Sequence, residues 1–163
     1  EGELMSRFHN GEVVNGDTTN HKGQAFKTPG GHTVYGGGGI TPDIFIPFDT
    51  TTLPKGVEQV YTKRTIDNFV YHYFLDHKTQ LLSYTSPSDF YRKFKPGEAE
   101  WQQLAAQARK DTIDLGTVPP AVKEDLLEQF QLSLARQIWR SNGFYEVRNQ
   151  TDPMVKKALE LLK

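Results

Sequence analysis

The stretch that decides the fold runs from Phe26 to Pro47 and reads Phe-Lys-Thr-Pro-Gly-Gly-His-Thr-Val-Tyr-Gly-Gly-Gly-Gly-Ile-Thr-Pro-Asp-Ile-Phe-Ile-Pro. Its Pro29-Gly30-Gly31 segment predicts a turn, because proline presets φ and glycine accepts a positive φ. The residues from His32 to Tyr35 form a short β-prone run. The four glycines from Gly36 to Gly39 then predict a second reversal of the chain.

A third β-prone run extends from Asp43 to Phe48. Pro42 and Pro47 bound it, and neither can donate a hydrogen bond to a β-ladder. Together the three runs predict a small antiparallel β meander of about three short strands, starting near Gln24.

After this stretch the sequence is typical of helices. The first expected helix begins near Thr62 or Lys63 and is ended by Tyr84-Thr85-Ser86. The others are a short helix capped by Ser86 with Pro87 at its first position, Glu98 to about Thr112, Ala121 to about Ser141, and a last helix starting at Thr151-Asp152-Pro153. The serine–proline and aspartate–proline pairs are typical helix starts. We expect Asn142-Gly143 to end the fourth helix, because glycine commonly follows the last helical turn.

Apolar residues recur at helical spacing in each of these segments, which predicts one buried face per helix. In the first helix they are Ile66, Phe69, Val70, Tyr73, Phe74, His77 and Leu81; in the short one Phe90, Tyr91 and Phe94; in the third Trp101, Leu104, Ala105 and Ala108; in the fourth Val122, Leu126, Leu127, Phe130, Leu134, Ile138 and Trp139; in the last Val155, Ala158, Leu159 and Leu162. The predicted fold class is therefore α+β: a small antiparallel β meander, followed by a mainly α-helical subdomain. We divide the chain into residues 1–56 and 57–163.

Composition restricts the classes of function. The 163 residues carry 19 basic and 20 acidic side chains, for a formal charge of −1, so no electrostatic signal for nucleic acid is present. No apolar run approaches the roughly 20 residues that span a bilayer, so we expect no transmembrane segment. The absence of cysteine excludes disulfides, cysteine-type zinc sites and a thiol nucleophile.

The glycine-rich stretch also carries a family resemblance. The residues that fit the family pattern are Thr28, Pro29, Gly31, Val34, Gly37, Gly39, Ile40, Pro42 and Asp43. At this spacing they resemble the segment that follows the catalytic residues in the carboxyl-terminal processing, or tail-specific, proteases, which are S41-type serine peptidases with a Ser–Lys dyad. Two positions depart from the pattern: Gly30 stands where serine is usual, and His32 stands where arginine is usual.

The resemblance implies that this chain is the C-terminal portion of a bacterial serine endopeptidase acting in the proteolysis of envelope proteins. Residues 1–56 would then supply the last strands of the catalytic core, and residues 57–163 a helical appendage. It further implies a periplasmic or envelope location, protein or peptide substrates that bind the parent protein, and no cofactor or metal.

In the resembled family the nucleophilic serine and the lysine base both precede this motif. The 25 residues before it contain one serine, Ser6, and one lysine, Lys22, and neither has the surrounding pattern of the family. We therefore assign no catalytic, cofactor-binding or metal-binding residue, and we expect this chain to be inactive alone. The alternative is a non-enzymatic helical protein–protein interaction module, which the apolar helix faces support equally well.

Other candidate sites have simpler interpretations. No helix start follows the Gly36–Gly39 run in the form that a phosphate loop requires, so a turn is favoured. His72 and His77 are five residues apart and share a helix face poorly, which disfavours a zinc pair. His32 is interpreted as an exposed strand residue. The charged side chains Lys123, Glu124, Asp125, Glu128 and Arg136 are interpreted as the solvated face of the fourth helix. An unpaired β edge leaves self-association open.

Overall fold

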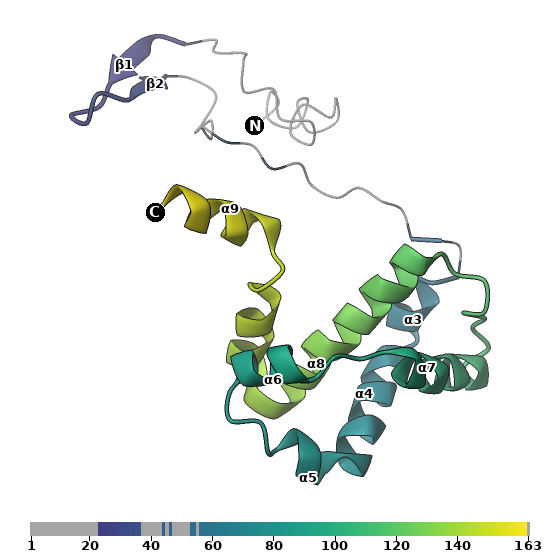
Figure 1. The fold of residues 1–163 in the computed structure, drawn as a ribbon. Coiled ribbons are helices and arrows are strands. Elements are labelled where there is room, and N and C mark those ends of the chain that lie inside the picture. The colour runs from purple at the N-terminus through teal and green to yellow at the C-terminus, as the bar shows by residue number, and fades with distance from the viewer. Residues whose placement is uncertain (1–22, 37–43, 45, 47–52, 55, 163) are drawn as a thin grey trace. The chain divides into compact units, whose positions relative to one another are not determined.

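The computed structural model describes residues 23–36, 44, 46, 53–54 and 56–162. The chain forms two compact units, Glu1–Thr51 and Thr52–Lys163. The described part of the first unit contains a two-stranded antiparallel sheet, and the second unit is helical (Figure 1). The predicted α+β class is confirmed at this level, with helix as the dominant structure.

The first unit carries a β hairpin, in which β1 (Ala25–Lys27) pairs with β2 (Thr33–Tyr35) and Phe26 lies opposite Val34. The predicted third strand, Asp43–Phe48, lies outside the described residues except for Ile44 and Ile46, which belong to no strand.

The turn of the hairpin forms where the Pro-Gly-Gly segment predicted it. Gly31 donates its N–H to the Thr28 carbonyl at 2.9 Å, and Thr28 donates its own N–H to the His32 carbonyl at 2.9 Å. Gly31 has φ +83°, which glycine adopts without strain. This is a three-residue loop with a left-handed glycine at its end, a common hairpin connection.

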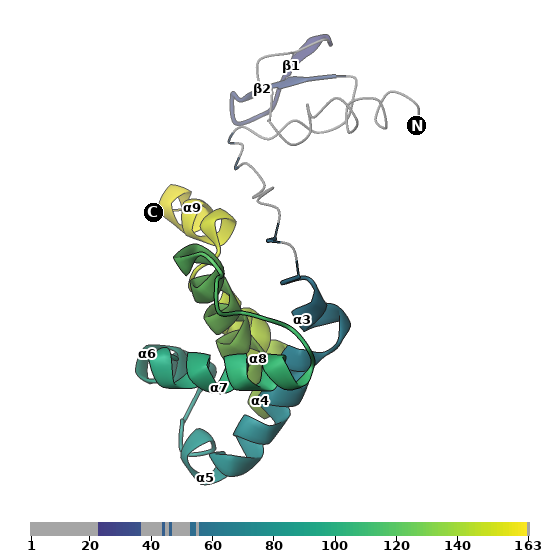
Figure 2. The ribbon, with the colours of Figure 1, turned by 90° about the vertical axis from the view of Figure 1, so that its right-hand side faces the viewer.

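Seven helices make up the described part of the second unit. They are α3 (Gln59–Thr62), α4 (Thr65–Asp76), α5 (Lys78–Leu81), α6 (Pro87–Lys93), α7 (Glu98–Lys110), α8 (Pro120–Arg148) and α9 (Pro153–Leu161). The long helix α8 packs against α4, α6 and α7, so it organises the core of this unit (Figures 1 and 2).

Aromatic rings fill the centre of that core. Phe130 of α8 is fully buried, with its ring centroid 4.8 Å from that of Phe69 and 5.0 Å from that of Tyr73. Phe90 and Phe94 stack at 4.9 Å on the α6 side of the same cluster. The predicted apolar stripe of the fourth helix is confirmed at Phe130.

The predicted starts of two helices are confirmed by their caps. The Ser86 hydroxyl accepts the Asp89 N–H at 3.1 Å, with Pro87 as the first residue of α6. The Asp152 carboxylate accepts the N–H of Met154 at 2.8 Å, and Pro153 opens α9. Each cap satisfies a backbone donor that has no partner inside its helix.

The predicted first helix is wrong in its continuity. The segment begins earlier, with α3, and is interrupted at Arg64, which has φ +58°. It is interrupted again at His77, where φ is −113° and ψ is 19°. The imidazole ring of His77 stacks on the Tyr73 ring at 4.0 Å, and its Nδ1 lies 3.0 Å from the Tyr73 carbonyl oxygen. The apolar face still reaches Leu81, which is buried.

The predicted end of the fourth helix at Asn142-Gly143 lies close to a break in α8, where two helical segments meet at a kink. Helix α8 continues to Arg148 and changes direction at Arg140, whose φ of 62° and ψ of −151° are not helical. Gly143 is buried, and a Cβ there would lie 2.6 Å from Trp139 Cβ and 2.7 Å from the Ala135 carbonyl oxygen. The glycine therefore permits close packing between turns of α8 and does not end the helix.

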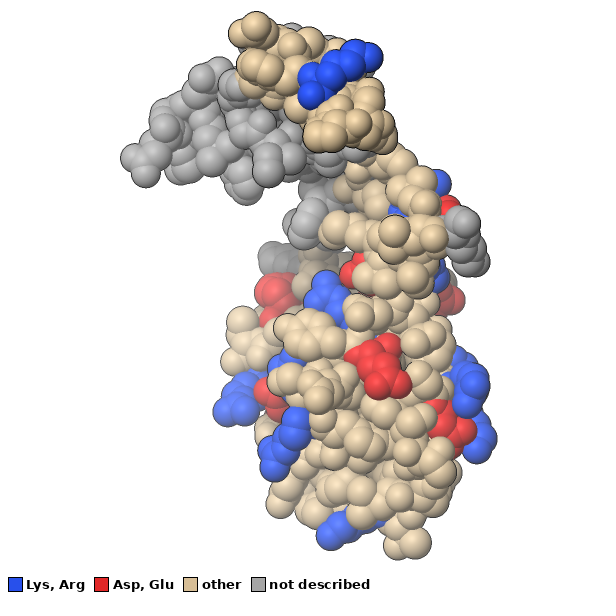
Figure 3. Space-filling model, turned by 90° about the vertical axis from the view of Figure 1, so that its left-hand side faces the viewer, with Lys and Arg blue, Asp and Glu red and all other residues tan. Residues whose placement is uncertain are grey.

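The surface of the helical unit mixes charges of both signs. On the face shown in Figure 3, basic and acidic side chains are interspersed. None of the helices in the described part of the chain combines the length and the apolar character needed to cross a bilayer.

Candidate functional site

Ser6 and Lys22, the serine and lysine that precede the motif, lie outside the described residues. Two of the described serines have structural roles: Ser86 caps α6, and the Ser88 hydroxyl donates to Glu146 Oε1 at 2.7 Å. In the described ranges no serine hydroxyl is bonded to a lysine or a histidine. The helical unit therefore presents no serine with an adjacent base there.

The histidines of the described residues do not converge. His72 is exposed, and His77 is occupied by its stacking on Tyr73. Across residues 23–36 and 56–162, no group of three His, Cys, Asp or Glu side chains could hold a metal ion. His32 is exposed, directly before β2, and its backbone N–H donates to the Thr28 hydroxyl at 3.2 Å.

One half-buried carboxylate, that of Glu100, has two hydrogen-bond donors around it. Glu100 accepts the N–H of Gly97 at 2.8 Å and the Tyr73 hydroxyl at 3.1 Å. Partial burial acts to raise the pKa of Glu100, but these hydrogen bonds outweigh it and the net pKa is lowered. Burial, with Glu100 beside it, raises the pKa of the Tyr73 hydroxyl far above its usual value. The carboxylate of Glu100 thus accepts hydrogen bonds from the start of α7 and from the Tyr73 hydroxyl.

A groove of about 590 Å³ lies between α4 and α8 and is the candidate site of the helical unit. Its lining residues are Arg64, Asp67, Asn68, Val70, Tyr71, Gln129, Ser133, Arg136, Gln137 and Phe144. The volume falls in the range of roughly 300–1,000 Å³ that small-ligand pockets occupy. We call it the α4–α8 groove.

The α4 side of the groove is the solvent face of that helix. Arg64, Asn68 and Tyr71 are spaced at i, i+4 and i+7, so they follow one line along the helix. The ring of Tyr71 is half exposed at 51%. Arg64 Nε lies 3.2 Å from Asp67 Oδ2, which partly neutralises this arginine.

The α8 side is shaped by the change of direction at Arg140. The Arg136 guanidinium lies 4.1 Å from the centroid of the Phe144 ring. Eight residues of a straight helix span about 12 Å, so the kink helps to bring these two side chains together. Among the described residues no carboxylate pairs with Arg136. The groove therefore contains two arginines and one aspartate.

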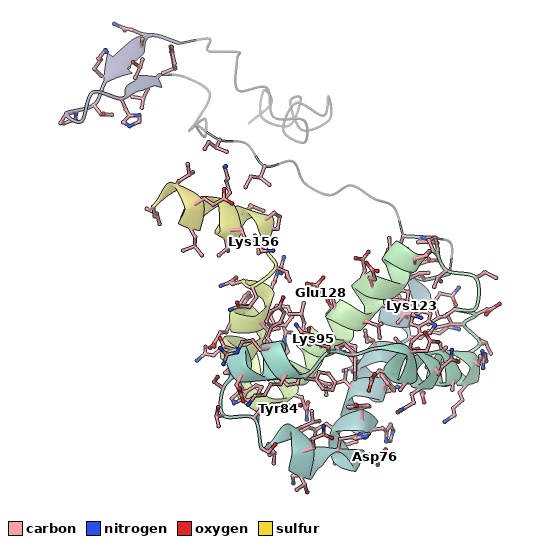
Figure 4. The ribbon with its side chains drawn as sticks, in the orientation of Figure 1. Asp76, Tyr84, Lys95, Lys123, Glu128 and Lys156 are labelled. Carbon is pink, nitrogen blue, oxygen red and sulfur yellow. The ribbon has the colours of Figure 1, made fainter. Side chains whose placement is uncertain are left out.

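A second hollow of about 540 Å³ lies between α6 and the part of α8 that precedes the kink at Arg140. Lys95 covers the ring of Tyr91 at 3.8 Å, and the Thr151 hydroxyl donates to Glu128 at 2.7 Å. Figure 4 shows Lys95 and Glu128 among the side chains of this region. These polar groups already have partners in the chain, so the hollow is the weaker candidate.

The interpretation of the charged residues on the fourth helix holds for exposure but misses two contacts. Glu124, Glu128 and Arg136 are exposed as predicted. Lys123 is half-buried and bonded to Glu98 across to α7, and its ammonium lies 5.3 Å from the Trp101 ring centroid (Figure 4). The cation–π contact of Arg136 was missed because its partner lies beyond the predicted end of the helix.

Residues 57–141 match the model of DUF8443, a family of unknown function. The chain belongs to this family. The DUF8443 match starts at the buried Val57 and ends just after the kink at Arg140, so it includes most of the α4–α8 groove. Neither the comparison with curated proteins nor the comparison with solved structures gave a match.

Proposed function

We propose that this chain is the C-terminal portion of a serine endopeptidase of the carboxyl-terminal processing type, acting on proteins of the bacterial envelope. The observation that carries the proposal is the sequence motif from Thr28 to Asp43, with its two predicted turns and its Gly-Ile-x-Pro-Asp ending. The described helical unit then serves as an appendage, and the nucleophile and base come from residues upstream.

The geometry of the hairpin supports this proposal at the turn positions of the motif. Thr28 closes the turn with its backbone and its hydroxyl, Pro29 presets the turn, and Gly31 supplies the positive φ. Each of these residue types is therefore favoured by the local structure.

The two departures from the family pattern, Gly30 and His32, lie at positions where the hairpin uses no side-chain contact. A Cβ at Gly30 would meet nothing within 4 Å, so serine fits there equally well. His32 is exposed and contributes only backbone hydrogen bonds to the turn, so arginine would fit as well. Both exchanges are thus compatible with one turn geometry.

A helical interaction module is the second candidate, and α9 favours it. The predicted buried face of the last helix is wrong, because α9 has no buried residue. Met154, Leu159 and Leu161 are each at least half exposed. Exposed apolar side chains on one short helix are typical of a contact surface. An interaction module would need no upstream dyad.

The sequence encoded upstream of Glu1, followed by a peptidase assay, tests the proposal. We expect a serine in a small-residue stretch and a lysine some tens of residues later. The longer protein should cleave casein and fluorogenic peptides, and the serine-to-alanine variant should lose about 10⁴-fold or more in rate. The present chain should show no cleavage.

Two results would count against the proposal. The first is an upstream sequence without a serine and a lysine in that order. The second is cleavage by the present chain that the Ser6→Ala substitution abolishes, which would place the nucleophile inside this chain.

A further inference from the structure

We propose that helix α9 binds the surface of a membrane that contains anionic phospholipids. The helix would lie in the plane of that surface, with its apolar face among the acyl chains next to the headgroups. A helix of nine residues is about 14 Å long, roughly half the thickness of a hydrocarbon core, so α9 is too short to cross a bilayer. The inference goes beyond the proposed peptidase function and does not rest on it.

The apolar face of α9 is open to solvent. None of the residues of α9 is buried, and its apolar and polar residues are separated more sharply than those of α4, α7 or α8. At about 3.6 residues per turn, the apolar side chains fall in one sector of about 160°. These side chains are Met154, Val155, Ala158, Leu159, Leu161 and the C-cap Leu162. Leu162 lies near the middle of the sector and is 83% exposed. Such strong segregation is typical of helices that lie in a membrane interface.

The charges of α9 are placed as an anionic surface requires. On the same helical projection, Lys156 and Lys157 border the apolar sector on its two sides, and Glu160 lies opposite its middle. Lysines at these borders bury their methylene stems and extend their ammonium groups to the lipid phosphates, while the carboxylate stays on the far side. Lys157 Nζ lies 3.1 Å from Glu160 Oε2, whereas Lys156 has no carboxylate partner among the described residues (Figure 4).

The net charge of −1 conceals a basic segment around α9. Residues 148–163 carry a formal charge of +2, and residues 1–147 carry −3. The charged side chains of the basic segment are Arg148, Asp152, Lys156, Lys157, Glu160 and Lys163. An anionic leaflet attracts basic side chains that lie within about one Debye length of it. The excess of positive charge therefore coincides in the sequence with the exposed apolar face.

Two other occupants of this face fit the observations less well. Two α9 helices from two copies of the chain would lie side by side over only about 14 Å, which is too short to bury the roughly 1,200 Å² of a stable interface. A helix held in a groove of another protein presents one line of anchors at i, i+3, i+4 and i+7. The apolar sector of α9 is broader than that line, and a lysine borders it on each side. A bilayer covers the whole face without a preformed groove.

Vesicle flotation with the full chain tests the proposal. The probes are vesicles of phosphatidylcholine with about 30 mol% phosphatidylglycerol, and vesicles of phosphatidylcholine alone. We expect the anionic vesicles to bind the chain at least about fivefold more tightly, because lysine side chains approach the charged surface. Raising the salt from about 0.1 M to about 1 M should remove most of this preference, because the Debye length falls from about 10 Å to about 3 Å.

Two variants assign the binding to α9. Leu162→Glu places a charge in the middle of the apolar face and should weaken binding by at least about tenfold. Lys156→Gln should weaken binding to the anionic vesicles by about fivefold and leave binding to phosphatidylcholine unchanged.

Matched controls make the same two exchanges elsewhere on the helical unit. Leu75→Glu and Lys78→Gln replace exposed side chains of α4 and α5. Helix α5 and the adjoining end of α4 lie at the far end of the unit from α9 (Figures 1 and 2), so both controls should bind vesicles as the wild type does. All four replaced side chains are exposed, and circular dichroism melts should match that of the wild type.

Equal binding to the two kinds of vesicle at low salt would overturn the proposal, as would wild-type binding by Leu162→Glu. Absence of binding at lipid concentrations on the order of 5 mM would do the same. Light scattering of the lipid-free chain supplies a further test, because a dimer that Leu162→Glu dissociates would assign the face to a second copy and not to lipid.

The outcome is separate from that of the peptidase test. Vesicle binding by a protein without an upstream dyad refutes only the proposed function. A dyad in a protein whose α9 binds no vesicle refutes only this inference.

Discussion

The hairpin and the long helix α8 reach their structures by different physical routes. Every residue of β1 and β2 is exposed, and the ring of Phe26 is 51% accessible to solvent. Phe130 of α8 has no accessible surface at all. The hairpin is specified by turn chemistry alone, whereas α8 is specified by the apolar area that it removes from water.

This contrast implies unequal stability. Two short strands without a buried face are marginal in water. The helical unit buries a continuous set of side chains from α4, α6, α7 and α8. We therefore expect the turn to fix the shape of the hairpin and a further β partner to stabilise it. The predicted self-association through its edge would be one source of that partner.

Hydrogen exchange should show the largest difference between the two regions. Amides of β1 and β2 should be protected at least about 1,000-fold less than those of Leu126–Leu134 in α8, because local opening of the hairpin exposes almost no new apolar surface. Mass spectrometry of exchanged peptides measures both regions in one sample. Light scattering on that sample is the control, and equal protection in a strict monomer would contradict the comparison.

Truncation of the central ring should be the most damaging single substitution. Phe130→Ala should cost about 3–5 kcal/mol in the free energy of unfolding, because it leaves a cavity among Phe69, Tyr73 and Phe94. Urea denaturation followed by circular dichroism gives the value. Tyr145→Ala is the matched control on the same helix, since this ring is 57% exposed, and it should change stability by less than about 0.5 kcal/mol. A decrease of less than about 1 kcal/mol in the free energy of unfolding of Phe130→Ala would show that Phe130 is not at the centre of the core.

Replacing one glycine by alanine in each region should change the stability by different amounts, and the larger change should be of intermediate size. Gly143→Ala should destabilise the helical unit by about 1–3 kcal/mol, because the added methyl group meets Trp139 Cβ and the Ala135 carbonyl. Gly30→Ala is the control in the hairpin, where the same methyl group meets nothing within 4 Å. The measurement is the urea midpoint of both variants. Equal midpoints would show that α8 relaxes around residue 143 without cost.

A smaller effect should appear in the pH dependence of the helical unit. The folded-state pKa of Glu100 is lowered below 4.5, so its contribution to stability is present above pH 4.5 and is lost as the pH falls through the folded pKa. Glu100→Gln keeps an acceptor for the Gly97 N–H and should change stability at pH 7 by about 1 kcal/mol or less. Below pH 4.5, the free energy of unfolding of this variant should fall less steeply with decreasing pH than that of the wild type. If the free energy of unfolding fell equally steeply with decreasing pH in both proteins, Glu100 would not be the source of this pH dependence.

Local chemistry explains which parts of the fold could be predicted. Ser86, Asp152 and the Pro-Gly-Gly turn act through bonds to residues two to four positions away, and all three were predicted correctly. The burial of Phe130 follows from helical spacing. Interactions between residues that are close in the sequence can therefore be predicted from the sequence.

The parts that could not be predicted depend on distant or irregular contacts. Thr112 has φ +61° and ends α7, and the N–H of Ile113 then reaches back to the Ala108 carbonyl at 2.9 Å. This cap carries Leu115 into the core, although it lies in a segment predicted as a linker. Gln131 is buried because its amide donates to the Phe94 carbonyl, 37 residues away. Neither contact has a periodic signature.

The α4–α8 groove could not be predicted from the sequence for the same reason. Spacing places Arg64, Asn68 and Tyr71 on one line of α4, but it also predicts an ordinary solvated face. What distinguishes the groove is the kink at Arg140, which helps to bring Phe144 to Arg136. A residue that looks like an ordinary surface cation in the sequence is thus placed by a break in the helix four residues later.

The position of α8 along the chain has a consequence for biosynthesis. Helices α4, α6 and α7 all precede α8, and each of them packs on it. During translation at roughly 5–20 residues per second, their apolar faces remain without this partner until Phe130 has been added and has left the ribosome. The nascent helices are therefore open to chaperones and to proteases for several seconds, and the core closes only when nearly the whole unit has been made.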